Sequence, residues 1–102
     1  MTLSIDVNDN TEKGTWEIKL IGEIDINNAQ IFQGRLETAL SGKRQDITLD
    51  LSDLEYIDST GLGVIIGTYT SIDDEGLKIK IVNPKNNVKK LLNISGLDKI
   101  FC

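Results

Sequence analysis

A serine and a threonine stand side by side in the segment YIDSTGLGVIIG, residues 56–67. The hydroxyl of Ser59 could serve as a nucleophile, as a phosphoryl acceptor or as a helix cap. A nucleophilic serine needs a general base, and the chain contains no histidine, so a serine–histidine triad is excluded. The segment also lacks the G-x-S-x-G pattern of serine hydrolases. The residues therefore favour modification of Ser59, and we predict no catalytic residue and no enzymatic activity.

Phosphate-cradling loops and metal centres have little support in the sequence. A nucleotide-binding loop of the type G-x-x-x-x-G-K-[ST] requires a lysine that this segment lacks. The absence of histidine also removes most zinc sites. We expect no metal site and no cofactor. A glycine-lined helix N-terminus can attract anions, so a nucleotide- or small-anion-binding domain stays open as the weakest alternative.

Helix capping is the simplest role for the polar residues of this segment. Asp58 or Ser59 could accept hydrogen bonds from the backbone N–H groups that the first turn of a helix leaves unpaired. The glycines need a separate explanation, because each costs a helix interior up to about 1 kcal/mol relative to alanine. Gly61, Gly63 and Gly67 would permit close approach, either of the sheet or of another protein.

Alternating apolar and polar residues predict the strands that position this segment. The alternation with period two covers residues 3–7, 16–20, 47–51 and 77–81. The segment NDNTEKG is predicted to form a loose loop between the first two strands. LDKIFC, at the end of the sequence, is predicted to form a short final strand.

Helical spacing of apolar residues predicts three helices between these strands. They cover residues 27–41, a stretch that begins with the serine motif and stops near Gly76, and residues 88–94. The order β-β-α-β-α-β-α-β predicts one α/β domain over residues 1–102. Because the strands alternate, one face of the mixed sheet should be open to water and the helices should pack mainly on the other.

Composition limits the partners and the location of the protein. The net charge of −5 disfavours nucleic acid as a partner. No apolar run is long enough to cross a membrane, and the N-terminus lacks the features of a secretory signal. The only cysteine, Cys102, cannot form an internal disulfide. We therefore expect a cytoplasmic protein that binds neither nucleic acid nor membrane.

Charge is unevenly distributed along the chain. Between Arg44 and Lys78 there are eight acidic residues and no basic one. From Lys78 onward there are six lysines and one acid, Asp98. Solvated faces that pair in three dimensions would explain this pattern, and so would an acidic surface that selects a basic partner.

Three segments of the chain resemble one protein family. The run LDLSDLEYIDSTGLGVIIGTY, residues 49–69, is similar to the signature of the STAS-domain anti-sigma factor antagonists of bacterial sporulation and general-stress regulation. GEIDINNA, residues 22–29, is similar to the G-E-[LI]-D segment of the family. VKKLLNISGLDKIF, residues 88–101, is similar to its late L-[FL]-x-[IM]-[ST]-G-L pattern. Together these segments extend from residue 22 to residue 101, and the D-S-[ST]-G-L-G core is a specific signal.

The resemblance implies a phosphorylation switch. In that family the serine directly after the aspartate, here Ser59, is phosphorylated by an anti-sigma factor that is also an ATP-dependent serine kinase. The unphosphorylated protein binds the kinase, which releases a sigma factor; phosphorylation ends the binding and a serine phosphatase restores it. The resemblance also implies a partner-binding surface that contains Asp25, Asp58, Thr60, Gly61, Leu62 and Gly63.

Two features qualify the resemblance. Family members commonly carry a further helix after the last strand, and we expect this chain to lack an obvious extra C-terminal helix. STAS domains also occur in transport-associated proteins and in stress-sensing complexes. A constitutive adaptor subunit, in which Ser59 only caps a helix, is therefore the second alternative.

Overall fold

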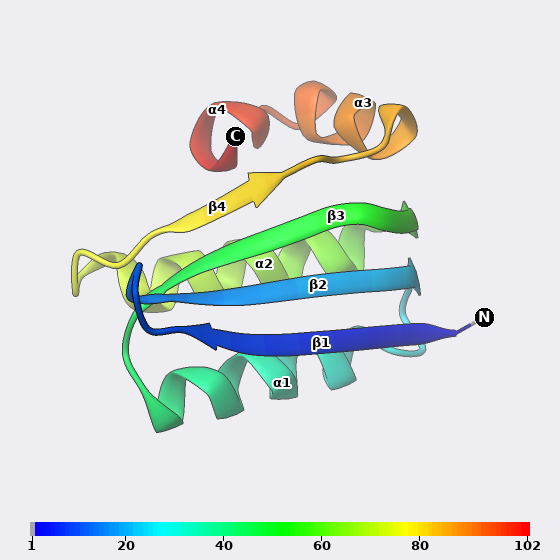
Figure 1. Ribbon diagram of the computed structural model, residues 1–102. Helices are drawn as coiled ribbons and strands as arrows, with labels where there is room; N and C mark the ends of the chain where they lie inside the picture. Colours follow the sequence, from blue (N-terminus) through cyan, green and yellow to red (C-terminus); the bar gives the residue numbers. More distant parts are fainter. Residues whose placement is uncertain (1) are drawn as a thin grey trace.

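Four strands form one mixed sheet in the computed structural model of the protein, which describes residues 2–102 (Figure 1). β1 (Leu3–Asn10) and β2 (Thr15–Ile24) are antiparallel. β3 (Asp46–Ile57) runs parallel to β2, and β4 (Ile79–Val82) runs parallel to β3. The strand order across the sheet is β1-β2-β3-β4. The first four predicted strands are thus confirmed, and the domain is of the predicted α/β class.

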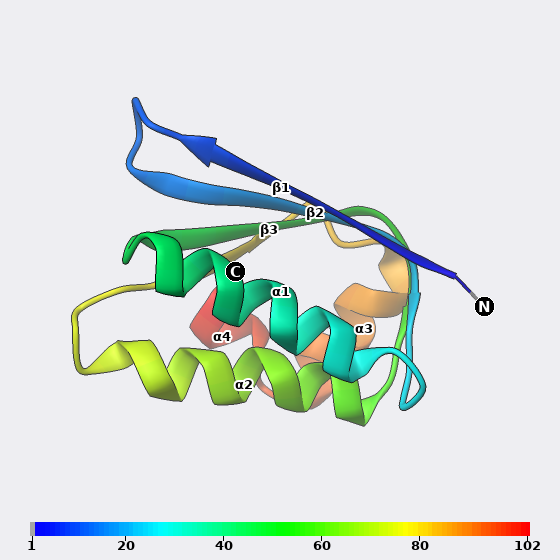
Figure 2. The ribbon, with the colours of Figure 1, turned by 90° about the horizontal axis from the view of Figure 1, so that it is seen from below.

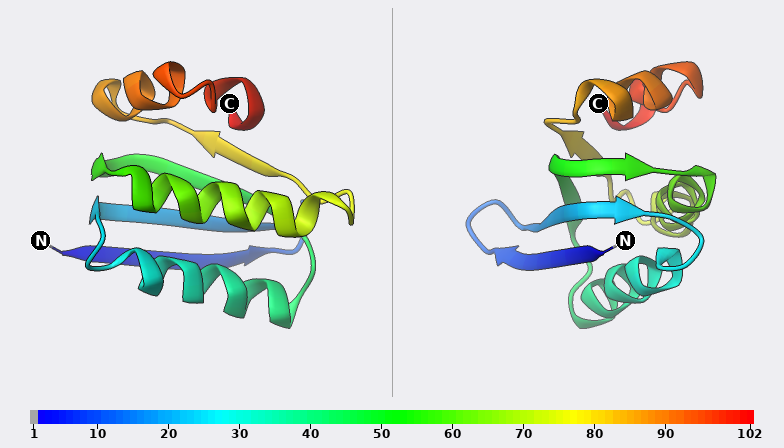
Figure 3. Two further views of the ribbon diagram at one scale, coloured as in Figure 1. Left: turned by 180° about the vertical axis from the view of Figure 1, so that it is seen from behind. Right: turned by 90° about the vertical axis from the view of Figure 1, so that its right-hand side faces the viewer.

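The helices lie on one side of the sheet (Figure 2). α1 (Ala29–Gly42) and α2 (Ser59–Asp73) lie next to each other, and α3 (Asn86–Ile94) and α4 (Asp98–Phe101) lie toward the β4 edge (Figure 3). The other face of the sheet carries polar side chains, as the alternation predicted. No helix within residues 2–102 combines the length and apolar character that crossing a membrane requires.

A single core fills the space between the sheet and the helices. Every second residue of the central strands points into it, and α1 and α2 each contribute one apolar stripe. Its most deeply buried members include Ile18, Leu20, Leu49, Leu51, Phe32, Leu36, Ile65 and Ile72, each 1% exposed or less. This core fixes α2, and with it the serine motif, against the ends of β2 and β3.

The predicted final strand is wrong, because residues 98–101 form α4. Leu97 and Phe101 are four residues apart and both are buried, which suits a helical face rather than a strand. The ring of Phe101 meets that of Tyr69 edge to face, with centroids 5.4 Å apart. We expected no further helix after LDKIFC, the predicted fifth strand. In the structure the last strand is β4, and it is followed by α3 and α4.

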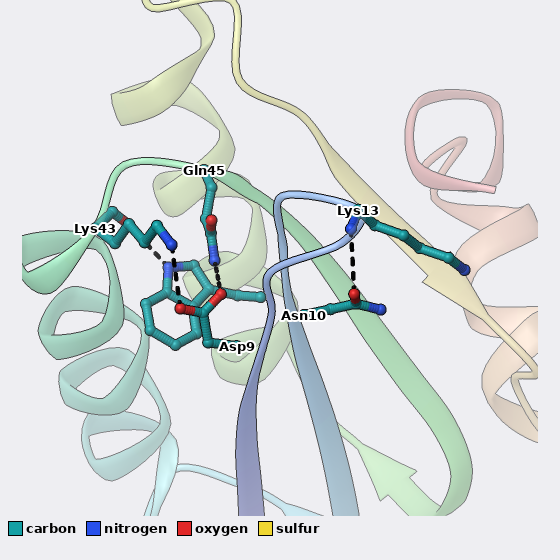
Figure 4. A network of polar contacts seen from close by, with 6 residues as sticks. Asp9, Asn10, Lys13, Lys43 and Gln45 are labelled. Atoms are coloured by element: carbon teal, nitrogen blue, oxygen red, sulfur yellow. Dashed lines mark hydrogen bonds and ion pairs between the residues drawn. The ribbon is translucent and has the colours of Figure 1, made fainter.

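The connection between β1 and β2 is tight, in contrast to the loose loop that was predicted. Residues 11–14 form the turn, and Gly14, with a φ of +66°, donates its backbone N–H to the carbonyl oxygen of Asn10 at 2.9 Å. The side chain of Asn10 accepts a second bond from the backbone N–H of Lys13 at 3.2 Å (Figure 4).

A polar network fastens this hairpin to the connection between α1 and β3 (Figure 4). The Asp9 carboxylate accepts hydrogen bonds from Nε2 of Gln45 at 2.8 Å and from Nζ of Lys43 at 3.3 Å. The indole N–H of Trp16 donates to the carbonyl oxygen of Lys43 at 2.8 Å. The bonds from Gln45 and Lys43 lower the pKa of Asp9. The network lies where β3 begins, at the opposite end of that strand from the serine motif.

Candidate phosphorylation and partner-binding site

The Asp25 segment and the Ser59 segment meet at one edge of the sheet. Asp25 directly follows β2 and Asp58 directly follows β3, and these two strands are parallel neighbours. The backbone N–H of Asp58 donates to the carbonyl oxygen of Ile24 at 3.1 Å. Loops at the carboxyl ends of parallel strands are frequent binding sites. The fold thus brings together two segments that are more than thirty residues apart in the chain.

Gly22 sets the path of β2 toward this edge. Its φ is +108°, and a Cβ atom there would lie 2.2 Å from the carbonyl oxygen of Thr2. The pairing of β2 with β3 shifts register between Gly22 and Glu23. Such a bulge bends a strand and redirects the residues that follow it. The glycine of the G-E-I-D segment is therefore required by the backbone.

The loop after β2 is held by its own polar side chains. The carboxylate of Asp25 accepts the backbone N–H of Asn27 at 2.9 Å. The side chain of Asn28 accepts the backbone N–H of Asp25 at 2.9 Å and donates to the carbonyl oxygen of Glu23 at 2.9 Å. Sequence analysis missed Asn28, which is buried. Its only signal is an asparagine directly before a helix, which is too common to single out a residue.

Asp58 is the N-cap of α2. One oxygen of its carboxylate accepts the backbone N–H groups of Thr60 at 2.9 Å and of Gly61 at 3.2 Å, together with the hydroxyl of Thr60. The Thr60 hydroxyl is the main cause that lowers the pKa of Asp58, and the backbone N–H groups of Gly61, Thr60 and Ile26 lower it further. Asp58 therefore stays ionised at neutral pH, and its lowered pKa makes it a poor general base for its neighbour Ser59.

The cap leaves the Ser59 hydroxyl without a structural task. Ser59 is the first residue of α2 and is exposed. Within residues 2–102, no side-chain hydrogen bond of Ser59 is formed, whereas the Thr60 hydroxyl is committed to Asp58. Of two adjacent hydroxyl groups, only the one on Ser59 is accessible and unengaged. The question of which residue caps the helix is thereby answered in favour of Asp58.

The three glycines of the motif have different surroundings. A Cβ atom on Gly61 would lie 2.7 Å from Cγ2 of Ile24 and 2.7 Å from Cγ1 of Ile57, so this position needs glycine for packing against the sheet. A Cβ atom on Gly63 or on Gly67 would meet no atom within 4 Å. Close approach to the sheet is therefore confirmed at Gly61, whereas Gly63 and Gly67 face open space and approach by another protein stays a prediction there.

The predicted partner-binding residues divide by exposure. Gly63 is exposed, and Asp25, Asp58, Thr60 and Leu62 are partly exposed. Gly61 is buried and packs against Ile24 and Ile57. Leu62 also packs against the hydrophobic core.

Comparisons with known proteins agree with this geometry. The STAS domain family model matches residues 6–101. The anti-sigma-B factor antagonist of Bacillus subtilis (strain 168) is 32% identical over 101 residues, which cover 99% of this chain and 90% of that relative. The structure of the anti-sigma factor antagonist SpoIIAA in its unphosphorylated form matches with a TM-score of 0.85 and 23% identity, over 97% of this chain and 86% of that one.

A second solved structure carries a modification. The Bacillus cell fate determinant SpoIIAA in its phosphorylated form matches with a TM-score of 0.77 and 23% identity, over 97% of this chain and 89% of that one. The two SpoIIAA structures show the same fold, and the family match extends over nearly the whole chain. The chain belongs to the STAS domain family, as its three motif segments indicated.

Proposed function

We propose that the protein is an anti-sigma factor antagonist, a regulatory binding protein controlled by phosphorylation of Ser59. The unphosphorylated form binds an anti-sigma factor that is also a serine kinase, and this binding releases a sigma factor. Phosphorylation of Ser59 ends the binding, and a serine phosphatase restores it. The names of the Bacillus relatives, an anti-sigma-B factor antagonist and SpoIIAA, support the general role.

One observation carries the proposal: the Ser59 hydroxyl is exposed and unengaged at the first position of α2. The acceptor hydroxyl must reach the ATP bound by the kinase while the substrate protein stays folded. Thr60 meets this requirement poorly, because its hydroxyl is bonded to Asp58. Modification at Ser59 leaves the Asp58 cap in place.

The charge of a phosphate explains how the switch would act. A phosphoserine carries about −1.5 to −2 charges at neutral pH. The dipole of α2 favours a negative charge at its N-terminus, so the folded state tolerates the modification. A partner that covers this position must instead bury the phosphate beside Asp58, which costs several kcal/mol unless a cation pairs with it. Because about 1.4 kcal/mol corresponds to a tenfold change in affinity, a loss of about a hundredfold is within reach.

The two alternatives receive less support from the site. For the alternative of an anion-binding domain, the backbone N–H groups of Thr60 and Gly61 would have to bind the anion. The Asp58 carboxylate already accepts both of these N–H groups. A constitutive adaptor would use Ser59 only as a cap, and Asp58 takes that role.

The test uses three baits in a pull-down from lysate of the source cells, read by mass spectrometry: wild type, Ser59→Ala and Ser59→Glu. We expect wild type and Ser59→Ala to retain one anti-sigma factor with a kinase domain, and Ser59→Glu to lose it. Incubation of the purified partner with ATP should phosphorylate wild type and the matched control Thr60→Ala, but not Ser59→Ala.

Two results would contradict the proposal. If all three baits retain the same proteins, charge at Ser59 decides nothing and the adaptor alternative gains. If Ser59→Ala is phosphorylated to the same extent as wild type, the acceptor is another residue.

A further inference from the structure

The outward side of α2 presents an uncharged surface that begins at Ser59. Residues four, seven, eight and eleven positions after Ser59 share its side of the helix. We name this set the α2 face: Ser59, Gly63, Ile66, Gly67 and Thr70, all of them exposed. No charged residue occurs between Ser59 and Ile72. A stretch of this length without charge on an exposed helix is unusual, because charged residues normally cover such a surface.

The threonine and serine hydroxyl groups in the later turns of this helix bond to its own backbone. Thr70 donates to the carbonyl oxygen of Ile66 at 3.0 Å, and Thr68 donates to that of Val64 at 2.8 Å. Ser71 donates to the carbonyl oxygen of Thr68 at 2.7 Å. Beyond Ser59, the α2 face therefore offers a partner the side chain of Ile66, the methyl group of Thr70 and the open backbone of two glycines.

Two isoleucines are the most apolar features of this surface. Ile66 lies in the α2 face and its exposed fraction is 41%. Ile26 lies in the loop after β2 with an exposed fraction of 74%. It follows Ile24 by two residues, and the carbonyl oxygen of Ile24 accepts the backbone N–H of Asp58 at 3.1 Å, so this loop lies next to the start of α2. Exposed apolar groups that gather on one surface mark interaction sites.

Acidic residues lie at both ends of this surface. Asp25 and Asp58 lie at the Ser59 end, and Asp73 and Asp74 lie at the other end of α2. If two copies paired through the α2 face about a twofold axis, the Asp58 end of one helix would meet an acidic end of the other. Like charges placed opposite each other disfavour such a pair. The surface is therefore complementary to a different protein, one with an apolar centre and a rim of lysine or arginine opposite Asp73 and Asp74.

We propose that the anti-sigma factor lies along the α2 face, with Ile26 and Ile66 as its apolar anchors, beyond the residues of the serine motif. This inference rests on the proposed function. It adds the chemistry of the partner surface, which is apolar opposite Ile66 and basic opposite Asp73 and Asp74, at the end of α2 that lies away from Ser59. Gly67 lets the partner approach the helix closely, since nothing in the chain itself occupies the space beside it.

The experiment measures the dissociation constant of the purified anti-sigma factor retained by the wild-type bait, using Ile26→Ala, Ile66→Ala and Gly67→Ala. We expect each isoleucine variant to bind about tenfold or more weakly, as truncation of an interface anchor does. Ile94→Ala is the matched control, because Ile94 is 78% exposed but lies at the end of α3; its affinity should equal that of wild type. Gly67→Ala should bind more weakly while its melting temperature does not fall, which separates lost contact from lost folding.

The outcomes separate this inference from the proposed function. If wild type binds, Ser59→Glu does not, and the three variants all bind like wild type, the partner does not lie along the α2 face and only this inference is overturned. If the purified anti-sigma factor does not bind wild type, both proposals fall. An affinity that does not weaken as salt rises from about 50 to about 300 mM would overturn the basic rim.

Discussion

Asp58 joins the two segments of the site. Its carboxylate accepts the Thr60 hydroxyl and the N–H of Gly61 from its own helix, and its backbone N–H donates to the carbonyl oxygen of Ile24 at the end of β2. The Thr60 hydroxyl is the largest of the causes that lower its pKa. Thr60 therefore acts as a positioning residue for Asp58, although it lies beside the proposed phosphorylation site.

Removal of the Thr60 hydroxyl should raise the pKa of Asp58. In Thr60→Val the carboxylate loses this donor, so we expect its pKa to move up toward the ordinary value of 3.8. Thr60→Ser keeps the donor and should keep the low pKa. Titration of the Asp58 carboxyl carbon by NMR measures both. Equal pKa values in wild type and Thr60→Val would contradict the assignment.

The same variant has a consequence for stability against pH. The pKa of Asp58 is lower in the folded protein than in the unfolded one, so the carboxylate stabilises the fold above the unfolded value. That contribution is lost as the pH falls through the folded-state pKa. The difference in melting temperature between wild type and Thr60→Val should therefore shrink between about pH 5 and about pH 2. A difference that stays constant over this range would contradict the linkage.

At the scale of the element, α2 combines one glycine that the fold requires with two that it does not. Gly61→Ala would place a methyl group 2.7 Å from Ile24 and from Ile57, which are branched and fully buried. We expect it to lower the free energy of unfolding by about 1–3 kcal/mol, as overpacking of a core does. Urea denaturation measures the change.

Gly63→Ala and Gly67→Ala are the matched controls on the same helix. Neither new methyl group would meet another atom of the chain within 4 Å. Because alanine is the better helix former, each variant should gain up to about 1 kcal/mol. If all three variants were destabilised alike, the division between a packing glycine and surface glycines would be wrong.

At the scale of the whole molecule, the two ends of the central strands have separate tasks. The network of Asp9, Lys43 and Gln45 fastens the hairpin where β3 begins, and the serine motif lies where β3 ends. Gln45→Ala removes a buried donor, so we expect its melting temperature to fall by about 5 °C. Gln33→Ala, an exposed glutamine on α1, should leave it unchanged. Both variants should bind the anti-sigma factor like wild type; weaker binding by Gln45→Ala at a temperature where it is folded would show that the ends are coupled.

Much of this architecture could be predicted from the sequence, because alternation and helical spacing depend on neighbouring residues. Leu49 and Leu51 were placed in a strand, and Gly76, with its φ of +75°, lies in the turn after α2. The α4 segment was missed because its apolar residues, Leu97, Ile100 and Phe101, do not alternate and span too few turns to display a helical period.

Only those features of the site that depend on residues adjacent in sequence could be predicted. The spacing of Asp58 and Ser59 suggested a cap and a free hydroxyl, although it could not say which residue took which role. The bond between the backbone N–H of Asp58 and the carbonyl oxygen of Ile24 depends on the pairing of β2 with β3, which no local pattern reveals. The different surroundings of Gly61 and Gly67 follow from which side of α2 faces the sheet.

The free hydroxyl of Ser59 has a consequence for how a cell could use the protein. Because this hydroxyl holds nothing together, the proposed switch would add and remove a phosphate while the same folded molecule persists. Neither form has to be degraded and made again for the signal to change. Information would then reside in the ratio of two equally folded populations, and the response time would be that of the kinase and the phosphatase instead of that of protein synthesis.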